Sequence, residues 1–180
     1  MFRNSSQWHN LTPGDRTPEF VNGVIEIQKG AKAGYELSNT DVMLKLNRVL
    51  FSSYFYPANY GFIPKTYCPN KGPLKIIILS QIGIVPLCIV NAKIIGVMRM
   101  IAIDEIDDKI ISVATGDPSV NNINDISELP VHFITELKNF FENYEMFEDK
   151  TKVVAEFLDR NQAKKILQES FNLYKSRFEK

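Results

Sequence analysis

The sequence predicts an α+β domain that is mainly β: a small closed or semi-closed, OB-like β-barrel with two C-terminal helices packed on it. Short apolar runs separated by turn residues fill the chain up to about residue 115, as in small barrels. Apolar residues recur at helical spacing after residue 130. The 180 residues, 44% of them hydrophobic, suit one domain with a real core, so we expect residues 1–180 to fold as a unit.

The first part of the chain predicts an arm followed by strands. Residues 1–21 are polar and rich in turn residues, so this arm must pack on the body to be ordered. Alternation of apolar and polar side chains then indicates the first strands of the barrel, which we place within residues 22–115. The strands expected here are residues 22–27, 35–37 and 43–51.

Further strands are expected after the segment that begins at Tyr54. The apolar runs are residues 74–79, 84–90, 93–103 and 109–114. Four acidic residues lie between the last two runs: Asp104, Glu105, Asp107 and Asp108. They lack the glycine and the spacing of a calcium loop, so we interpret them as a solvated turn.

Two helices are expected at the end of the chain, over residues 130–145 and 161–178. Pro130 suits the first turn of a helix. The apolar residues at helical spacing are Phe133, Leu137, Phe140, Phe141 and Tyr144 in the first helix, and Ile166, Leu167, Phe171, Tyr174 and Phe178 in the second.

Composition limits the classes of function. The 21 basic and 21 acidic residues cancel, which gives no electrostatic basis for binding nucleic acid or a membrane surface. No apolar run is long enough to insert into a membrane, and the N-terminus has no signal-peptide core. Cys68 and Cys88 are not at zinc or redox spacing and are expected to be reduced. We therefore expect an intracellular protein. The cytoplasm is the compartment we favour, and a mitochondrial or other organellar matrix is the alternative.

The rest of the chain is arranged around the stretch from Tyr54 to Ile78, whose layout and residue types point to different functions. An aromatic-rich turn, a loop containing Lys71, Gly72 and Pro73, and an apolar strand follow one another. This is the frame of a loop that binds phosphate and metal, yet no carboxylate lies between Tyr54 and Ile78.

Several ordered segments carry a resemblance to a known family. They are Trp8-His9 with Pro13-Gly14, VIEI at 24–27, YEL at 35–37, LKLNRVLFS at 44–52, YPANYGFIPKTYC at 56–68, IGVMRM at 95–100, DDKIISVA at 107–114, NDISELP at 124–130 and FFENY at 140–144. From about Trp8 to Phe178 the chain resembles the soluble, magnesium-dependent inorganic pyrophosphatases of family I. Their chemistry requires cationic donors for diphosphate, together with carboxylates that hold magnesium and so activate a water.

The resemblance implies roles for residues that match the family's pattern. Glu26 and Glu36 would be pocket carboxylates, and Arg48 and Lys109 would be cations that bind diphosphate. Tyr60 would be a hydroxyl donor that lies near the nucleophile. Asp107 would be a metal ligand, and Tyr144 would be a further phosphate donor.

Other positions depart from that pattern. The family's three loop aspartates align with Asn70, Gly72 and Lys75, and a further metal-binding aspartate aligns with Ala102. Two family lysines align with Gly34 and Glu145. Of the five aspartates that hold the family's metals, Asp107 alone remains. One aspartate does not hold magnesium usefully in water, so we expect no tightly bound cofactor and little or no hydrolysis.

The cationic half of the site is better preserved. The substitutions make the pocket about two charge units more positive than that of the family. We therefore hypothesise that phosphate or diphosphate binds without metal, with Arg48, Tyr60, Lys75, Lys109 and Tyr144 as donors. Glu26 and Glu36 have two open interpretations, a structural ion pair with Lys75 or residual metal binding. Packing and function are equally open interpretations of Tyr60.

Two classes of function follow. The first is a catalytically inactive or severely impaired homologue with a structural or anion-binding role, assembled with itself, with an active paralogue or within a larger complex. The alternative is an enzyme that retains residual metal-dependent hydrolysis of diphosphate to two phosphates. His9 and His132 are expected to be packing or surface residues rather than ligands.

Overall fold

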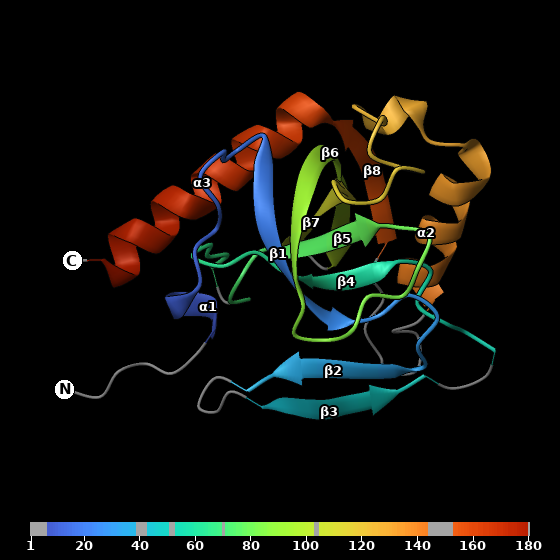
Figure 1. Cartoon of the computed structure of the whole chain (residues 1–180), viewed down its shortest axis with the longest axis horizontal. Helices are drawn as coiled ribbons and strands as arrows, with labels where there is room; N and C mark the ends of the chain where they lie inside the picture. Colours follow the sequence, from blue (N-terminus) through green and yellow to red (C-terminus); the bar gives the residue numbers. More distant parts are fainter. Residues whose placement is uncertain are drawn as a thin grey trace.

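The computed structural model describes residues 7–38, 43–50, 53–69, 71–102, 105–143 and 153–179. Its main sheet has six strands in the order β1-β4-β5-β7-β6-β8, and β1 also pairs with β6. Five strands therefore close into a ring, and β8 extends the sheet beyond β6 (Figure 1). The predicted mainly-β fold with a closed sheet is confirmed. The strands are β1 (Phe20–Ile27), β4 (Asn59–Phe62), β5 (Lys75–Leu79), β6 (Ile89–Ala102), β7 (Glu105–Ala114) and β8 (Val153–Asp159).

A second, two-stranded sheet lies beside the ring. It consists of β2 (Ala33–Leu37) and β3 (Leu44–Val49), paired antiparallel. In Figure 1 this hairpin lies below the ring, next to the end of β1. It supplies one wall of the candidate site described below.

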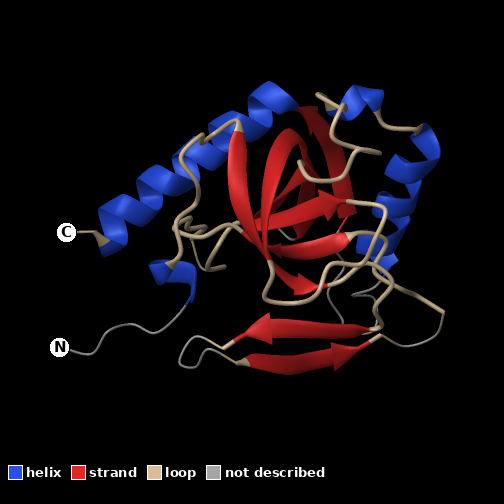
Figure 2. Ribbon diagram, viewed as in Figure 1, coloured by secondary structure: helices blue, strands red, loops and turns tan. Residues whose placement is uncertain are grey.

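Helices cover the ring from two sides, as Figure 2 shows. They are α1 (Gln7–Asn10), the 3-10 helix η1 (Ile126–Glu128), α2 (Val131–Asn143) and α3 (Arg160–Phe178). The two predicted C-terminal helices are present. The α3 helix begins where Asp159 accepts a hydrogen bond from the Gln162 amide, because a carboxylate at the N-cap satisfies an amide that has no partner within the helix.

The N-terminal arm packs on the body, as expected. The Trp8 indole donates a hydrogen bond of 2.7 Å to the Thr66 carbonyl. His9 stacks on Trp8 and approaches the Tyr174 hydroxyl to 2.7 Å. His9 is therefore a packing residue, and the short helix α1 around it was not predicted.

The core has two main clusters, one under each C-terminal helix. Ile77 and Leu79 of β5 belong to the cluster that includes Phe140 and Phe141 of α2. Ile76 and Ile78 belong to the cluster that includes Leu167 and Phe171 of α3. Successive residues of β5 are buried on opposite faces, which explains why this strand is a continuous apolar run.

Three expectations about the strands need correction. Residues 84–88, expected in a strand, form a loop, and β6 starts at Ile89 and continues to Ala102. Residues 105–108, expected in a solvated turn, are the first part of β7, while Asp104 lies outside the described residues. The strand tolerates these acids because Asp108 accepts two hydrogen bonds of 2.8 Å from Arg99, its cross-strand partner. Strand β8 was not predicted at all.

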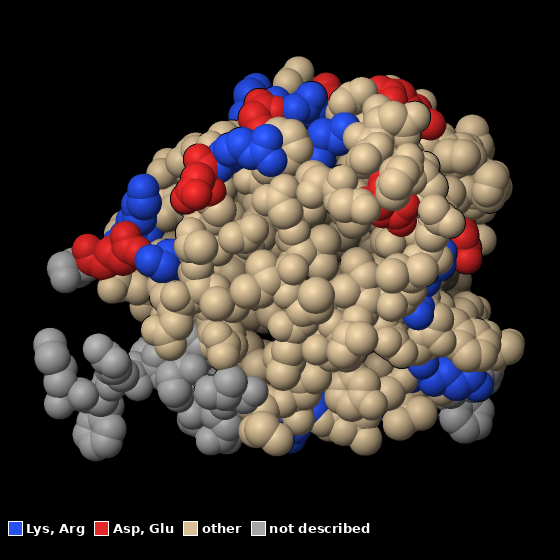
Figure 3. All heavy atoms as spheres, viewed as in Figure 1, with Lys and Arg blue, Asp and Glu red and all other residues tan. Residues whose placement is uncertain are grey.

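The surface shows no concentration of one charge sign in the view of Figure 3. Basic and acidic side chains lie mainly around the margin, with both signs side by side, and the centre of this face is largely uncharged. Within the part of the chain that the structure describes, no helix is long and apolar enough to cross a membrane.

Candidate functional site

A partly buried ion pair joins β1 and β5 at the centre of the site. Lys75 donates a hydrogen bond of 2.7 Å from its Nζ to Oε2 of Glu26, whose side chain is 3% exposed. The Leu37 amide donates to the other oxygen, Oε1, at 3.3 Å. The Lys75 ammonium also lies 5.9 Å from the ring centres of both Tyr60 and Phe62. The ion pair expected under one interpretation of Glu26 is present, and residual metal binding stays a prediction.

A second ion pair lies on the neighbouring strand β7. Lys109 Nζ donates to Asp107 Oδ2 at 2.9 Å, and Lys109 is almost fully buried. Its ammonium lies 5.8 Å from the Phe141 ring centre, under helix α2. Lys109 is also the register partner of Lys75 across the parallel pair β5–β7. The structure thus brings together four of the predicted site residues as two lysine–carboxylate pairs.

The two-stranded sheet positions Arg48 and Glu36 differently. Arg48 is opposite Gly34 in the register of β2 and β3. A Cβ atom at residue 34 would lie 2.8 Å from Arg48 Cγ and 3.3 Å from the Tyr56 hydroxyl. The stem of Arg48 therefore fills the place of a side chain at position 34. Glu36 is exposed on β2, where Lys45 is its register partner. Of the two glutamates, the one that the structure shows in contact with Lys75 is Glu26.

Tyr60 belongs to an aromatic cluster at the same end of the ring. Its ring centre lies 6.2 Å from that of Tyr56 and 5.8 Å from that of Phe141. Tyr56 in turn lies 4.9 Å from Phe140. Packing is therefore one role of Tyr60, and its predicted role as a donor near a nucleophile stays a prediction.

The loop before β5 is held by contacts that sequence reasoning did not find. Lys71 Nζ donates to the Ile106 carbonyl at 2.6 Å and lies 3.6 Å from a carboxylate oxygen of Glu105. The Cys68 amide donates to the Gly72 carbonyl at 2.8 Å, and Gly72 has a φ of +82°. No sequence pattern signals the contact of Lys71, because Lys71 and Ile106 are 35 residues apart.

Three of the predicted positions are not among the described residues, and a fourth ends strand β6. Asn70, Tyr144 and Glu145 lie outside the described residues. Ala102 is the last residue of β6, opposite Glu105 of β7. Among the described residues, no three His, Cys, Asp or Glu side chains gather closely enough to hold a metal ion.

A carboxylate outside this site, Asp117, has a lowered pKa and a structural role. Hydrogen bonds from the Ser119 hydroxyl, the Gln81 amide and the Ser80 hydroxyl hold the pKa of Asp117 well below its usual range. These bonds fasten the loop after β7 to the end of β5, because an ionised carboxylate is the stronger acceptor.

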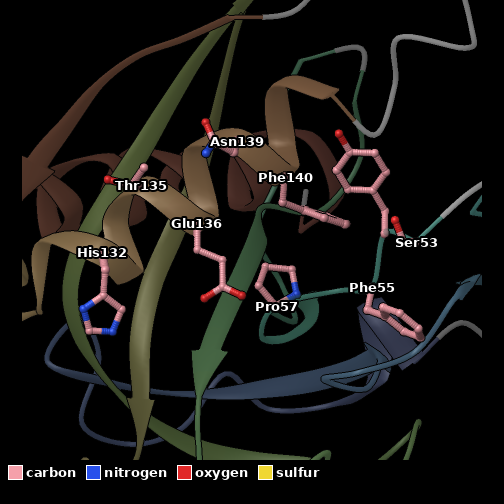
Figure 4. Close-up of a pocket in the computed structure, with 9 residues that line it drawn as sticks. Ser53, Phe55, Pro57, His132, Thr135, Glu136, Asn139 and Phe140 are labelled. Carbon is pink, nitrogen blue, oxygen red and sulfur yellow. The ribbon is translucent and has the colours of Figure 1, made fainter.

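A separate hollow of about 460 Å³ lies between α2 and the segment before β4. Figure 4 shows Glu136 and His132 projecting from α2 on the side of Pro57, with Phe55 at the other end. His132 is exposed here, as expected of a surface residue. The lining residues are Ser53, Tyr54, Phe55, Pro57, His132, Thr135, Glu136, Asn139 and Phe140.

The fold is that of solved inorganic pyrophosphatases. The enzyme of Thermus thermophilus superposes with a TM-score of 0.89 at 32% identity, over 94% of this chain and 99% of that one. The inorganic pyrophosphatase of Helicobacter pylori superposes with a TM-score of 0.87 at 30% identity, over 93% and 99%.

The chain belongs to the inorganic pyrophosphatase family, whose model matches residues 23–175. Soluble inorganic pyrophosphatase 2 of Chlamydomonas reinhardtii is 45% identical over 174 residues, 97% of this chain and 91% of that relative. Soluble inorganic pyrophosphatase 4 of Arabidopsis thaliana is 44% identical over 167 residues, 93% of this chain and 77% of the relative. The resemblance to family I seen in the sequence is confirmed.

Proposed function

We propose that this chain is an inorganic pyrophosphatase homologue with little or no hydrolytic activity, retained for an anion-binding or structural role. The observation that carries the proposal is the ion pair between Lys75 and Glu26. The carboxylate that the family pattern assigns to the pocket is bonded to an ammonium group, and that ammonium comes from a position where the family has an aspartate.

The donor chemistry of the site argues against magnesium. Magnesium sites in proteins use one or two carboxylates, several waters and substrate phosphates. Here Glu26 and Asp107 each contact a lysine ammonium, while Gly72 and Ala102 offer no carboxylate. A divalent ion at Glu26 would have to displace or approach the Lys75 ammonium, which repels it. Without a metal, the attacking water would stay near its bulk pKa.

The same contacts refine the anion-binding hypothesis. Lys75 and Lys109 each have a carboxylate within hydrogen-bonding distance, at 2.7 and 2.9 Å. Much of their charge is offset within the protein, so we expect the site to bind an anion only weakly. Titration calorimetry in EDTA tests this: we expect weak diphosphate binding that Arg48→Met abolishes. Absence of heat at millimolar diphosphate would exclude the anion-binding role.

Activity is tested by phosphate release from diphosphate with Mg²⁺, Mn²⁺ or Zn²⁺, beside the Chlamydomonas relative. We expect a rate at least about a thousandfold lower than that of the relative, because groups that act as a unit fail together. Turnover within a few hundredfold of the relative would overturn the proposal.

The alternative is residual metal-dependent hydrolysis. The identities of 45% and 44% to curated pyrophosphatases favour it, as do the matching residues Arg48, Tyr60 and Lys109. A rate that rises with Mg²⁺ and disappears in EDTA would support this alternative. A rate at the level of the buffer under both conditions would support the inactive homologue.

A structural role requires a partner. We propose assembly with copies of itself, with an active paralogue or within a larger complex inside the cell. Size-exclusion chromatography with light scattering, alone and after mixing with an active relative, tests the first two. A monomer under both conditions would leave a larger complex as the remaining form of the proposal.

A further inference from the structure

Two lysines, one in the loop before β5 and one at the start of β5, contact two other strands of the ring. Lys75, at the start of β5, binds Glu26 of β1. Lys71, four positions earlier, binds the backbone carbonyl of Ile106 on β7. A single short segment thus bridges β1 and the β6–β7 hairpin through two ammonium groups.

We infer that Lys71 and Lys75 form a clamp that holds the segment 71–75 to β1 and β7 without any divalent cation. The inference extends the proposed function, because it assigns to lysines the bridging role that metal-bound carboxylates would otherwise have. The clamp concerns the conformation of the loop and not the rate of diphosphate hydrolysis.

The two contacts differ in strength. The Lys75–Glu26 bond is short and its carboxylate is 3% exposed, so solvent screens it little. The Lys71 bond to the Ile106 carbonyl is also short, at 2.6 Å, but its nearby carboxylate, Glu105, is 67% exposed. We therefore assign most of the stabilisation to Lys75 and mainly a local ordering effect to Lys71.

Backbone hydrogen bonds also hold the described residues on either side of the loop. The Lys71 amide donates to the Cys68 carbonyl at 3.1 Å, and the Cys68 amide donates to Gly72 at 2.8 Å. The Leu74 amide donates to the buried Thr66 hydroxyl at 2.9 Å. These bonds hold the backbone of Cys68, Lys71, Gly72 and Leu74, while the side chains of Lys71 and Lys75 contact different strands.

The first experiment compares the unaltered protein in EDTA and in millimolar Mg²⁺. We measure the thermal midpoint, Tm, and the amide hydrogen exchange of residues 68–76. Both are expected to be the same in the two solutions. A rise in Tm or a slowing of exchange in Mg²⁺ would overturn the inference.

The second experiment removes each lysine. Lys75→Met is expected to lower Tm by about 5–12 °C, because it leaves the buried Glu26 carboxylate without its ammonium partner. Lys71→Met is expected to speed exchange of residues 68–76 at least about fivefold with a smaller change in Tm. Lys165→Met, at an exposed position of α3, is the matched control. Unchanged loop exchange in both variants would overturn the inference.

Two further variants keep the test informative if Lys75→Met folds poorly. Glu26→Gln combined with Lys75→Met removes the buried charge together with its partner, so folding is expected to recover while the loop exchanges faster than in the unaltered protein. Lys75→Asp puts a carboxylate beside Glu26, so Mg²⁺ is expected to raise its Tm relative to EDTA. Loop exchange as slow as in the unaltered protein for the double variant, or a Lys75→Asp protein indifferent to Mg²⁺, would count against the clamp.

These measurements separate the clamp from the proposed function. A phosphate-release rate near that of the relative, with Tm and exchange independent of Mg²⁺, would refute inactivity and leave the clamp intact. Magnesium-dependent Tm without turnover would refute the clamp and leave the inactive homologue.

Discussion

Lys75 and Lys109 are register partners on the parallel strands β5 and β7, so their side chains leave the same face of the sheet next to each other. Like charges in directly opposed positions destabilise a sheet. Each lysine has a carboxylate close by, Glu26 at 2.7 Å and Asp107 at 2.9 Å. The alternation of charge across these strands explains how two lysines are accommodated at one level of the ring.

This arrangement predicts the effect of removing Asp107. Asp107→Asn takes a charged partner from the nearly buried Lys109, so we expect the free energy of unfolding in urea to fall by about 1–3 kcal/mol. Adding Lys109→Met to Asp107→Asn is expected to restore part of the loss. Asp15→Asn, at an exposed position, is the control. Equal stability of Asp107→Asn and the control would show that the pair contributes nothing measurable.

At position 34, where the family has a lysine, we expect a larger side chain to collide with Arg48. Any side chain at position 34 would place its Cβ 2.8 Å from Arg48 Cγ, so Gly34→Lys is expected to cost about 1–3 kcal/mol in unfolding free energy. Gly34→Lys with Arg48→Ala should be more stable than Gly34→Lys alone. Gly116→Lys is the matched control, because no atom lies within 4 Å of a Cβ at Gly116. If both lysine substitutions are tolerated equally, Arg48 moves away without cost.

Restoring carboxylates at positions 70, 72, 75 and 102 predicts a gain of activity. The space at Gly72 is open, with no atom within 4 Å of a Cβ, but its φ of +82° costs an aspartate about 1 kcal/mol. We expect the fourfold aspartate variant to release phosphate with Mg²⁺ at least about a hundredfold faster than the unaltered chain. Lysines at positions 34 and 145 should raise the rate further only if Arg48 can move. The control has asparagine at the same four positions, which takes three substitutions because residue 70 is already Asn70. Equal rates for the two variants would mean that the loop backbone no longer fits a metal.

His9 predicts an acid-dependent loss of stability. Burial lowers the pKa of His9 below its ordinary value, and its Nδ1 lies 2.7 Å from the Tyr174 hydroxyl. The unfolded chain therefore binds more protons than the folded chain as pH falls below about 6.5, and the contribution of neutral His9 is lost as pH falls through the lowered pKa. Urea unfolding of the unaltered protein and of His9→Phe, at neutral pH and near pH 5, measures this.

We expect the unaltered protein to lose more stability on acidification than His9→Phe. His132→Phe, at an exposed histidine, should lose as much as the unaltered protein. An identical loss in all three proteins would assign the acid sensitivity to carboxylates instead.

Local patterns predicted some elements well and others poorly. The continuous apolar run of β5 and the helical spacing of Leu137, Phe140 and Phe141 were informative because a core exists on both sides of the ring. Strand β8 escaped prediction because only one of its residues, Val154, is buried. The loop at residues 84–88 resembles a strand in composition, yet Val85 and Leu87 are exposed and Leu87 has a positive φ.

The sequence by itself determined the family, the closed mainly-β fold with its two C-terminal helices, and the absence of carboxylates at positions 72, 75 and 102. The tertiary structure alone decided that Lys75 meets Glu26, that Lys71 reaches the Ile106 carbonyl and that Arg48 fills the space beside Gly34. Residue types and spacing are local properties, whereas these contacts join strands that are distant in the chain. Strand register and burial decide which of the available charges meet.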